Sequence, residues 1–284
     1  MKIIVTGSNG MLGREFVEVG GKRGKEMIGW TRKDLDLEKP EEGIRRLKEL
    51  KPDGVIHCAA ETNVDLCEQK PDWARRVNAE VTGRLAQAAR EVGAWFVYIS
   101  TSGLFDKKKG PFTEEDRPHP LTVYGNSKLE GEKEVRAAHP TALILRAGWL
   151  FGGPLELKKN FVGARLREAK SQKTIFSATD KHGSPTWTRD FAERALELMG
   201  QGIDGIVHLT NSGEATRFDY VREIFRLTGH QAPQRADSSQ FPRQAPVPND
   251  ERLDSCRIGK MRFWQEALAE YLQGQNSVFT QSGK

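Results

Sequence analysis

The sequence predicts an α/β fold in which helices cover both faces of a parallel sheet. Its first half alternates short apolar segments with longer amphipathic ones, which is the order of successive β-α-β units. The apolar segments are continuous rather than alternating in polarity, as expected for strands that are buried on both faces. A glycine-rich turn directly follows the first of them. These three observations favour a doubly wound sheet with right-handed crossovers.

The segments can be assigned in order along the chain. Strands are predicted at residues 2–6, 26–30, 54–58, 94–100 and 141–147, and helices at 12–19, 41–50, 73–92 and 123–138. Beyond about Phe151 the pattern is less regular, with helices expected at 161–170, 189–199, 218–227 and 259–272 and strands at 174–176 and 205–209. Four prolines between residues 231 and 249 predict an ordered irregular loop, and the polar residues 273–284 are expected to fray.

Two unequal parts follow from this change of pattern. Residues 1–150 are expected to form a domain built on the parallel sheet, and residues 151–284 mainly a smaller C-terminal α/β lobe. A segment near residues 188–210 has the strand and helix pattern of the first part. We therefore expect that segment to return to the sheet domain.

Composition is that of a globular protein with a well-buried core. Of the 284 residues 29% are charged, and no apolar segment approaches the roughly 20 residues that span a bilayer. The first strand reaches Gly7 too soon for a signal peptide. The three cysteines have no CxxC spacing and fit neither a disulfide framework nor a zinc site. We expect a cytoplasmic protein without a membrane partner or a bound metal.

The charge balance argues against nucleic acid as a partner. The net charge of +5 is a mild excess, which suits an anionic ligand but is too small for a nucleic-acid footprint. The densest basic run is Lys107-Lys108-Lys109. It contains no aromatic residues for base stacking, so a solvated loop is expected there.

The glycine-rich turn is the first feature that indicates a ligand. In the segment Gly7-Ser8-Asn9-Gly10-Met11-Leu12-Gly13, the first glycine can turn tightly, the second lets the backbone approach a pyrophosphate, and the third permits close packing of helix and strand. The helix that follows directs its unpaired N–H groups at phosphate. The GxxGxxG spacing also occurs in ordinary strand–helix turns. Because a strand precedes it and a helix follows it, we predict a Rossmann-type dinucleotide site.

The end of the second strand predicts which dinucleotide binds. Sites that prefer NAD place an acidic residue there to bind the ribose 2′-hydroxyl, whereas this chain has Trp30 and Arg32. A guanidinium suits a 2′-phosphate. We therefore predict that NADP(H) is preferred. NAD(H) remains possible because Asp34 and Asp36 are close by, although Asp36 with Leu37 more plausibly flanks the adenine.

Three further residues are typical of a ketone reductase. Tyr124 and Lys128 are four positions apart, so on a helix they share one face, and a nearby ammonium would lower the pKa of the phenol from its usual value of about 10. Such a pair also occurs by chance in many helices. Thr101 follows the fourth strand and would face the same cleft, since ligands sit at the carboxyl ends of parallel strands. Thr101 would polarise a carbonyl, Tyr124 would donate the proton, and Lys128 would bind the nicotinamide ribose.

At this point the chain resembles the extended short-chain dehydrogenase/reductases. It is more closely similar to the dTDP-4-dehydrorhamnose reductases, which reduce the C4 ketone of dTDP-4-dehydro-L-rhamnose with NAD(P)H. The resemblance extends over nearly the whole chain and rests on the order and spacing of many short segments. These segments are GSNGMLG, RKDLDL, KPDGVIHCAAETNVD, VNAEVTGRLAQAA, ISTSGLFD, PLTVYGNSKLEGE, LRAGWLFG, NFV, GSPTWTRD and RFWQEAL.

The resemblance implies a role for individual residues. Thr101, Tyr124 and Lys128 would be the catalytic set. The cofactor would be held by residues at the ends of the first three strands and on the following helices, namely Gly7, Asn9, Gly10, Met11, Leu12, Gly13, Arg32, Asp36, Leu37, Ala59, Ala60, Thr62 and Asn78, together with Tyr124 and Lys128. The sugar nucleotide would be bound by residues of the later loops, namely Thr101, Ser102, Trp149, Asn160, Ser184, Pro185 and Thr186.

One departure from the family pattern bears on the substrate. Family members usually have Ser-Thr-Asp-Tyr after the fourth strand, whereas this chain has Ser100-Thr101-Ser102-Gly103. A charge and a large ring are thereby lost from the pocket wall, which leaves the reduction chemistry intact and the sugar open. Related 4,6-dehydratases have Thr-Asp-Glu here, because elimination of water needs a carboxyl acid and a carboxylate base. Ser102 and Gly103 can act as neither.

Other functions are compatible with the same residues. Epimerisation at C4 needs only the hydride machinery. The regulatory subunit of eukaryotic methionine adenosyltransferase resembles the same family and acts by binding a partner, so a binding module with a structural nucleotide is a second class of function. Retention of Thr101, Tyr124 and Lys128 favours an enzyme that supplies deoxysugars for a surface polysaccharide or a glycosylated metabolite. Some relatives dimerise with help from Mg²⁺, so a homodimer is one possible assembly.

Overall fold

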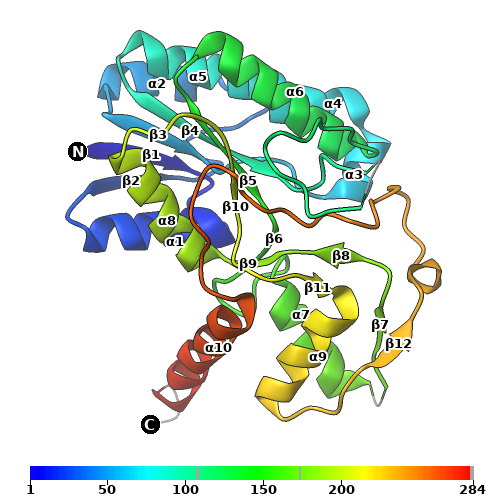
Figure 1. Ribbon diagram of the computed structural model, residues 1–284. Helices are drawn as coiled ribbons and strands as arrows, with labels where there is room; N and C mark the ends of the chain where they lie inside the picture. The colour runs from blue at the N-terminus through cyan, green and yellow to red at the C-terminus, as the bar shows by residue number, and fades with distance from the viewer. Residues whose placement is uncertain (107–108, 173, 282–284) are drawn as a thin grey trace.

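A six-stranded parallel sheet forms the centre of the computed structural model, which describes residues 1–106, 109–172 and 174–281 (Figure 1). The strand order is β10-β5-β4-β3-β1-β2, and every neighbouring pair is parallel. These strands are β1 (Lys2–Thr6), β2 (Glu26–Trp30), β3 (Gly54–His57), β4 (Trp95–Thr101), β5 (Leu143–Ala147) and β10 (Gly205–Leu209). Because β1 lies between β2 and β3, the strand order reverses there, which is where doubly wound sheets bind ligands.

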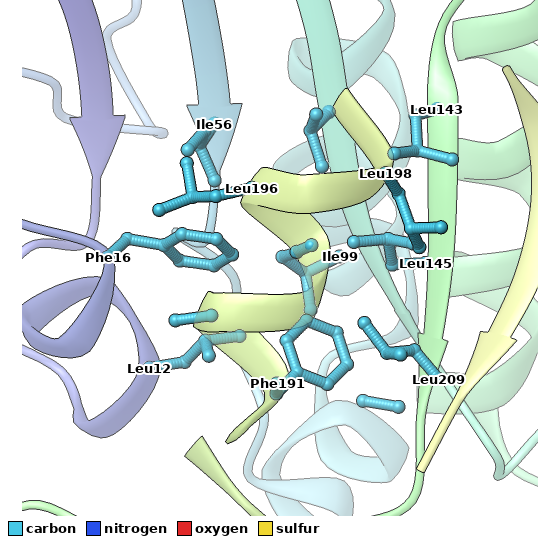
Figure 2. Close-up of a cluster of buried hydrophobic side chains, with 14 of the residues drawn as sticks. Leu12, Phe16, Ile56, Ile99, Leu143, Leu145, Phe191, Leu196, Leu198 and Leu209 are labelled. Atoms are coloured by element: carbon cyan, nitrogen blue, oxygen red, sulfur yellow. The ribbon is translucent and has the colours of Figure 1, made fainter. Parts of the chain in front are cut away.

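Helices cover both faces of this sheet, as the sequence predicts. Helices α1 (Met11–Lys22) and α8 (Thr188–Gly200) lie on one face, and α2 (Glu41–Leu50), α5 (Val81–Glu91) and α6 (Val123–Ala138) lie on the other (Figure 1). Each face has its own apolar core. On the α1 and α8 side, Phe16 and Phe191 meet edge to face with ring centroids 6.4 Å apart, against strand residues such as Ile99 (Figure 2).

The region between β3 and β4 differs from the single helix predicted at residues 73–92. It contains α3 (Val64–Gln69), capped by the Asn63 side chain, then α4 (Pro71–Arg75), a π-helical turn (Arg76–Glu80) and α5. The apolar pattern is continuous through all of the last three, so it could not reveal the wider turn. Such turns often occur at functional sites.

The C-terminal lobe is built on an aromatic core. Its helices are α7 (Phe161–Ser171), α9 (Arg217–Thr228) and α10 (Trp264–Gln281). Its strands form three short pairs, namely β6 (Trp149–Phe151) with β9 (Pro185–Trp187), β7 (Phe176–Ala178) with β12 (Gln234–Ala236), and β8 (His182–Gly183) with β11 (Ala215–Thr216). Tyr220 packs against Phe151, Phe161 and Trp264 in this core.

Several boundaries in this lobe differ from the prediction. The strand expected at 174–176 lies at 176–178, and the helix expected from residue 259 begins at Trp264. That helix runs to Gln281, so residues 273–281 are helical rather than frayed, and residues 282–284 lie outside the described chain. The loop at 231–249 contains β12 and a 3₁₀ turn (Ser238–Gln240). Lys109 is exposed as expected, whereas Lys107 and Lys108 are not described.

Within the described residues, no helix combines the length and the apolar character that crossing a membrane requires. The sheet and its two helical layers enclose two apolar cores, and Leu104, Phe105 and Phe112 pack separately with Leu253. Strand β10 and helix α8 belong to the same layers, although they follow the first strands of the lobe in sequence.

The core between α1, α8 and the sheet can be tested directly. Phe191 is fully buried, so Phe191→Ala should lower the free energy of unfolding by about 3–5 kcal/mol through lost burial and a residual cavity. Phe263, which is 58% exposed, is the matched control, and Phe263→Ala should cost less than about 1 kcal/mol. Urea unfolding of both variants measures the difference, and equal losses would contradict this packing.

Candidate active site

The glycine turn has the close backbone approaches that its sequence predicts. Gly7 has a φ of +65°, and a Cβ at Gly13 would lie 2.3 Å from the Gly7 carbonyl oxygen. The same oxygen accepts a hydrogen bond from the Gly10 N–H at 2.9 Å. Helix α1 then begins at Met11, after an N-cap glycine that provides no side-chain oxygen. The first-turn N–H groups at Met11 and Leu12 are thus available to an anionic ligand.

A cavity of about 220 Å³ adjoins this turn. It is lined by residues from the ends of β1, β2 and β3, which include the predicted cofactor residues Gly7, Asn9, Arg32, Asp36, Leu37, Ala59 and Ala60. Seven of the predicted residues thus meet at the reversal of strand order. A Cβ at Gly7 would lie 3.0 Å from the Ala59 nitrogen, so the turn also needs a glycine to approach the β3 end. The turn and the cavity fit a dinucleotide.

Arg32 lies at the mouth of this cavity. Its side chain is 75% exposed and contacts two acids, with Nη2 2.7 Å from Glu38 Oε1 and Nε 3.7 Å from Asp36 Oδ1. Exposed ion pairs of this kind contribute little to stability. The guanidinium is therefore free to exchange these partners for a phosphate.

Arg32→Ala should raise the KM for NADPH by about 10-fold and leave the KM for NADH little changed, since a charged hydrogen bond contributes about 1.5–3 kcal/mol. Steady-state kinetics with both cofactors measures the effect. Arg45→Ala, at an exposed arginine of α2 that also pairs with two glutamates, is the control. Equal KM values before and after the Arg32 substitution would show that Arg32 does not select the cofactor.

Asn78 orders the wall behind the cavity from its place in the π-helical turn. Its Nδ2 donates to the Glu61 carbonyl at 3.0 Å and to Ser127 Oγ at 3.1 Å, and its Oδ1 accepts from the Glu61 N–H at 2.9 Å. Asn78 thereby joins the loop after β3 to helix α6. Thr62, on the same loop, accepts a hydrogen bond from Lys159 at 2.8 Å and does not line the cavity.

The three predicted catalytic residues lie close together. Thr101 ends β4, and α6 begins beside it with Thr122 as its N-cap, which accepts the Gly125 N–H at 3.0 Å. A Cβ at Gly125 would lie 2.5 Å from the Gly103 carbonyl oxygen, so the first turn of α6 packs directly on the turn after β4. This contact brings the side chains of Tyr124 and Thr101 into a hydrogen bond.

The expected effect of Lys128 on the pKa of Tyr124 is not observed. The Lys128 ammonium donates to the Ile99 carbonyl at 2.8 Å and lies 4.1 Å from the centre of the Tyr98 ring. Burial lowers the pKa of Lys128 to about 7, which Glu132 opposes only in part. Burial also raises the pKa of Tyr124 to about 12, against the effect of its hydrogen bond with Thr101. Desolvation is the largest effect on both groups, and the phenol stays protonated at neutral pH.

The lowered pKa of Lys128 predicts an unusual pH dependence. The ammonium is lost as pH rises through about 7, so kcat/KM should fall above that pH rather than near the ordinary lysine value. In Lys128→Arg the side chain stays charged over the whole range, and the decline near pH 7 should disappear from the remaining activity. A pH profile of both proteins tests this, and an unchanged decline in the arginine variant would assign it to another group.

A larger cavity, of about 710 Å³, is lined both by the carboxyl end of β4 and by the C-terminal lobe. Thr101, Ser102 and Trp149 contribute to it, as predicted for substrate residues. The proline-rich segment near 241–248 forms part of its wall. We refer to this cavity as the substrate cleft.

The cleft also contains charged residues that the sequence did not reveal. Four cations and two acids line it, namely Arg165, Lys181, Arg217, Arg243, Asp237 and Glu251. They come from α7, α9 and irregular segments, and none belongs to a recognisable motif. The irregular proline-rich loop was the one signal in this region, because ordered loops often carry binding residues.

Four predicted substrate residues do not line the substrate cleft. Asn160 is fully buried, caps α7, and donates to the Gly152 carbonyl at 3.0 Å and the Tyr271 hydroxyl at 2.8 Å. Ser184, Pro185 and Thr186 are also buried. They support the Trp149 strand instead, since the Ser184 carbonyl accepts the Trp149 N–H at 2.9 Å. The sequence placed these residues near the cleft, but it could not show whether they contact the substrate or support the residues that do.

Comparison with known proteins agrees with this geometry. The profile of the family described as "RmlD substrate binding domain" matches residues 1–277. The chain belongs to this family. The dTDP-4-dehydrorhamnose reductase of Mycolicibacterium smegmatis is 35% identical over 280 residues, which cover 95% of this chain and 84% of that protein.

Solved structures of the family have the same architecture. A dTDP-4-dehydrorhamnose reductase from Clostridium acetobutylicum matches with a TM-score of 0.92 and 37% identity over 97% of this chain and 100% of that one. The Bacillus anthracis enzyme, solved in complex with NADP, matches with a TM-score of 0.91 and 29% identity over 96% of this chain and 100% of that one. The glycine turn and the adjoining cavity thus belong to a family with a member known to bind NADP.

Proposed function

We propose that this protein reduces the C4 ketone of a nucleotide-linked 4-dehydro-6-deoxysugar with NADPH, as its dTDP-4-dehydrorhamnose reductase relatives are named for doing. The observation that carries the proposal is the hydrogen bond of Tyr124 with Thr101, which lines a large cleft at the end of β4. The glycine turn and the 220 Å³ cavity lie at the same carboxyl edge of the sheet.

The residues at that edge fit NADPH, which supplies hydride to the ketone carbon when bound. First-turn amides of α1 would hold the pyrophosphate, and Arg32 would hold the 2′-phosphate. Lys128 would contact the nicotinamide ribose from its place beneath β4, where it donates to the Ile99 carbonyl.

Proton transfer is assigned to Tyr124. Its raised pKa keeps the phenol protonated, which is the state that a proton donor needs before reaction. Thr101 would donate a hydrogen bond to the carbonyl oxygen and hold it beside the phenol. As hydride reaches the carbon, the oxygen gains negative charge and becomes a stronger base than phenolate, so the proton then moves from Tyr124 to it.

The C-terminal lobe would hold the nucleotide part of the substrate. Arg165, Lys181, Arg217 and Arg243 give the cleft an excess of positive charge over Asp237 and Glu251. A diphosphate is the part of a sugar nucleotide that needs such charge. On this basis residues 151–284 are mainly the substrate lobe, with β10 and α8 returned to the sheet. The cytoplasmic location and the homodimer expected from the sequence stay predictions.

Tyr124→Phe tests the assignment of the proton donor. The substitution removes one oxygen and should lower kcat by about 10²–10⁴-fold, the usual contribution of a positioned acid. NADPH affinity, measured by fluorescence titration, should fall far less than kcat because the glycine turn and Arg32 are intact. Turnover close to that of the wild type would assign the proton to another group.

A second experiment distinguishes the reductase from the two alternatives, a binding module and an epimerase. NADPH oxidation is followed with a panel of dTDP- and UDP-linked 4-keto-6-deoxysugars, and the products are analysed by NMR. A reductase consumes one NADPH for each alcohol formed, whereas an epimerase interconverts C4 isomers without net consumption. Tight NADPH binding without turnover of any sugar would support the binding module and reject the reductase.

A further inference from the structure

The carboxylate of Glu251 occupies a position in the substrate cleft that the proposed chemistry does not yet explain. Its Oε2 accepts the Trp149 indole N–H at 2.8 Å. Its Oε1 lies 3.3 Å from where a Cβ on Gly103 would be, and Thr101 Oγ1 lies 3.6 Å from that same point. One carboxylate oxygen is therefore held by Trp149 and the other is directed at the turn that carries Thr101.

The backbone around Glu251 is firmly anchored. The Glu251 N–H donates to the His182 carbonyl at 2.9 Å, and the Leu253 N–H donates to Ser184 Oγ at 3.2 Å. Between them, Arg252 pairs with Asp250 at 2.7 Å and donates to the Gly110 carbonyl at 2.8 Å. The carboxylate is thus presented from a fixed segment, as a pre-organised binding group must be.

Trp149 holds opposite charges at its edge and on its face. Glu251 accepts the N–H in the plane of the ring, and the Arg217 guanidinium stacks 3.5 Å from the ring centre. This agrees with the charge distribution of an aromatic ring, which is positive at the edge and negative on the face. The three residues form a unit in which the anion lies beside Thr101 and the cation lies over the ring.

An anion beside Thr101 restricts what can bind there. A phosphate would be repelled, whereas a hydroxyl could donate a strong hydrogen bond to Oε1, for which the described part of the chain shows no hydrogen-bond donor. In a 4-keto-6-deoxyhexose, C3 is the neighbour of the ketone carbon that carries a hydroxyl. The ketone oxygen would bind Thr101 and Tyr124, which places the C3 substituent on the adjoining wall.

We propose that Glu251 is a specificity-determining residue that accepts a hydrogen bond from the C3 hydroxyl of the sugar. The inference rests on the proposed reduction and names the part of the substrate that this corner of the cleft recognises. Gly103 contributes to this arrangement, because a Cβ at that position would lie 3.3 Å from Glu251 Oε1 and crowd it.

The test compares two substrates in each variant. One is a dTDP-4-keto-6-deoxyhexose and the other is its 3-deoxy analogue, which has no hydroxyl to donate. Glu251→Gln and Glu251→Ala should lower kcat/KM for the hydroxylated sugar by about 10- to 100-fold, the range for a hydrogen bond to a charged group, and change the analogue little. Thermal unfolding establishes that each variant is folded, and Glu251→Gln retains the shape of the side chain.

Two control variants separate recognition from support. Asp237→Asn removes another acid from the same cleft and should change the two substrates by the same factor. Trp149→Phe keeps the carboxylate but breaks the hydrogen bond that holds it, so it should lower kcat/KM for the hydroxylated sugar more than for the analogue, although less than Glu251→Ala does. If the Glu251 variants also lower both substrates equally, Glu251 only supports Trp149 and the proposal is wrong.

Failure of the reductase proposal has a different signature. If the wild type reduces neither ketone, calorimetry with the corresponding alcohols, with and without the C3 hydroxyl, measures the same contact at equilibrium. If Glu251→Gln loses affinity only for the alcohol that has the C3 hydroxyl, the contact between Glu251 and that hydroxyl is supported even though the protein is not a reductase. Equal affinities of the two alcohols for the wild type, or binding of neither, would overturn it.

Discussion

The buried ion pair of Arg146 and Glu132 is the interaction on which the active site depends. Both side chains are at most 3% exposed, and Nη2 lies 2.7 Å from Oε2. Arg146 is on β5 and Glu132 is on α6, while Ser100 on β4 donates to the same carboxylate at 2.6 Å. His208 on β10 contacts the Arg146 guanidinium at 3.2 Å. Loss of either charge would leave the other buried without its partner, at a cost of about 3–5 kcal/mol.

That ion pair fixes the helix that carries the catalytic residues. Glu132 lies one turn after Lys128 and two turns after Tyr124, so all three share the face of α6 that meets the sheet. At its other end, α6 is set by the contact of Gly125 with the turn after β4. The distance between Tyr124 and Thr101 is thus determined by helix placement, and the side chains themselves need little adjustment. Rigid support of this kind favours reaction geometry.

The sheet domain was largely predictable because its apolar periodicity and its glycine spacing are local signals. The strand–helix order and the glycine turn follow from them, whereas cavity residues such as Ala59 and Ala60 were predicted only from the family resemblance. In the lobe the helices were predicted as well, but most of the short strands were not, since strands of two or three residues carry no periodic pattern. The predicted lowering of the Tyr124 pKa was wrong, because spacing reports proximity to Lys128 but not the burial that raises the pKa of the phenol. Asn160 and Ser184 were in the right region, and only packing shows that they support Trp149 and α7.

The substrate cleft combines residues that are far apart in sequence. The family pattern places an acid directly after the catalytic threonine, and this chain has Ser102 there. Glu251 brings a carboxylate to the same turn from a segment near the C-terminus, and Gly103 provides the space for it. On the proposed function, the acid beside Thr101 and the cations of the cleft would favour one direction of the substrate, with the sugar at β4 and the diphosphate in the lobe. In the proposed reaction, charge would therefore orient the substrate before the ketone meets Tyr124.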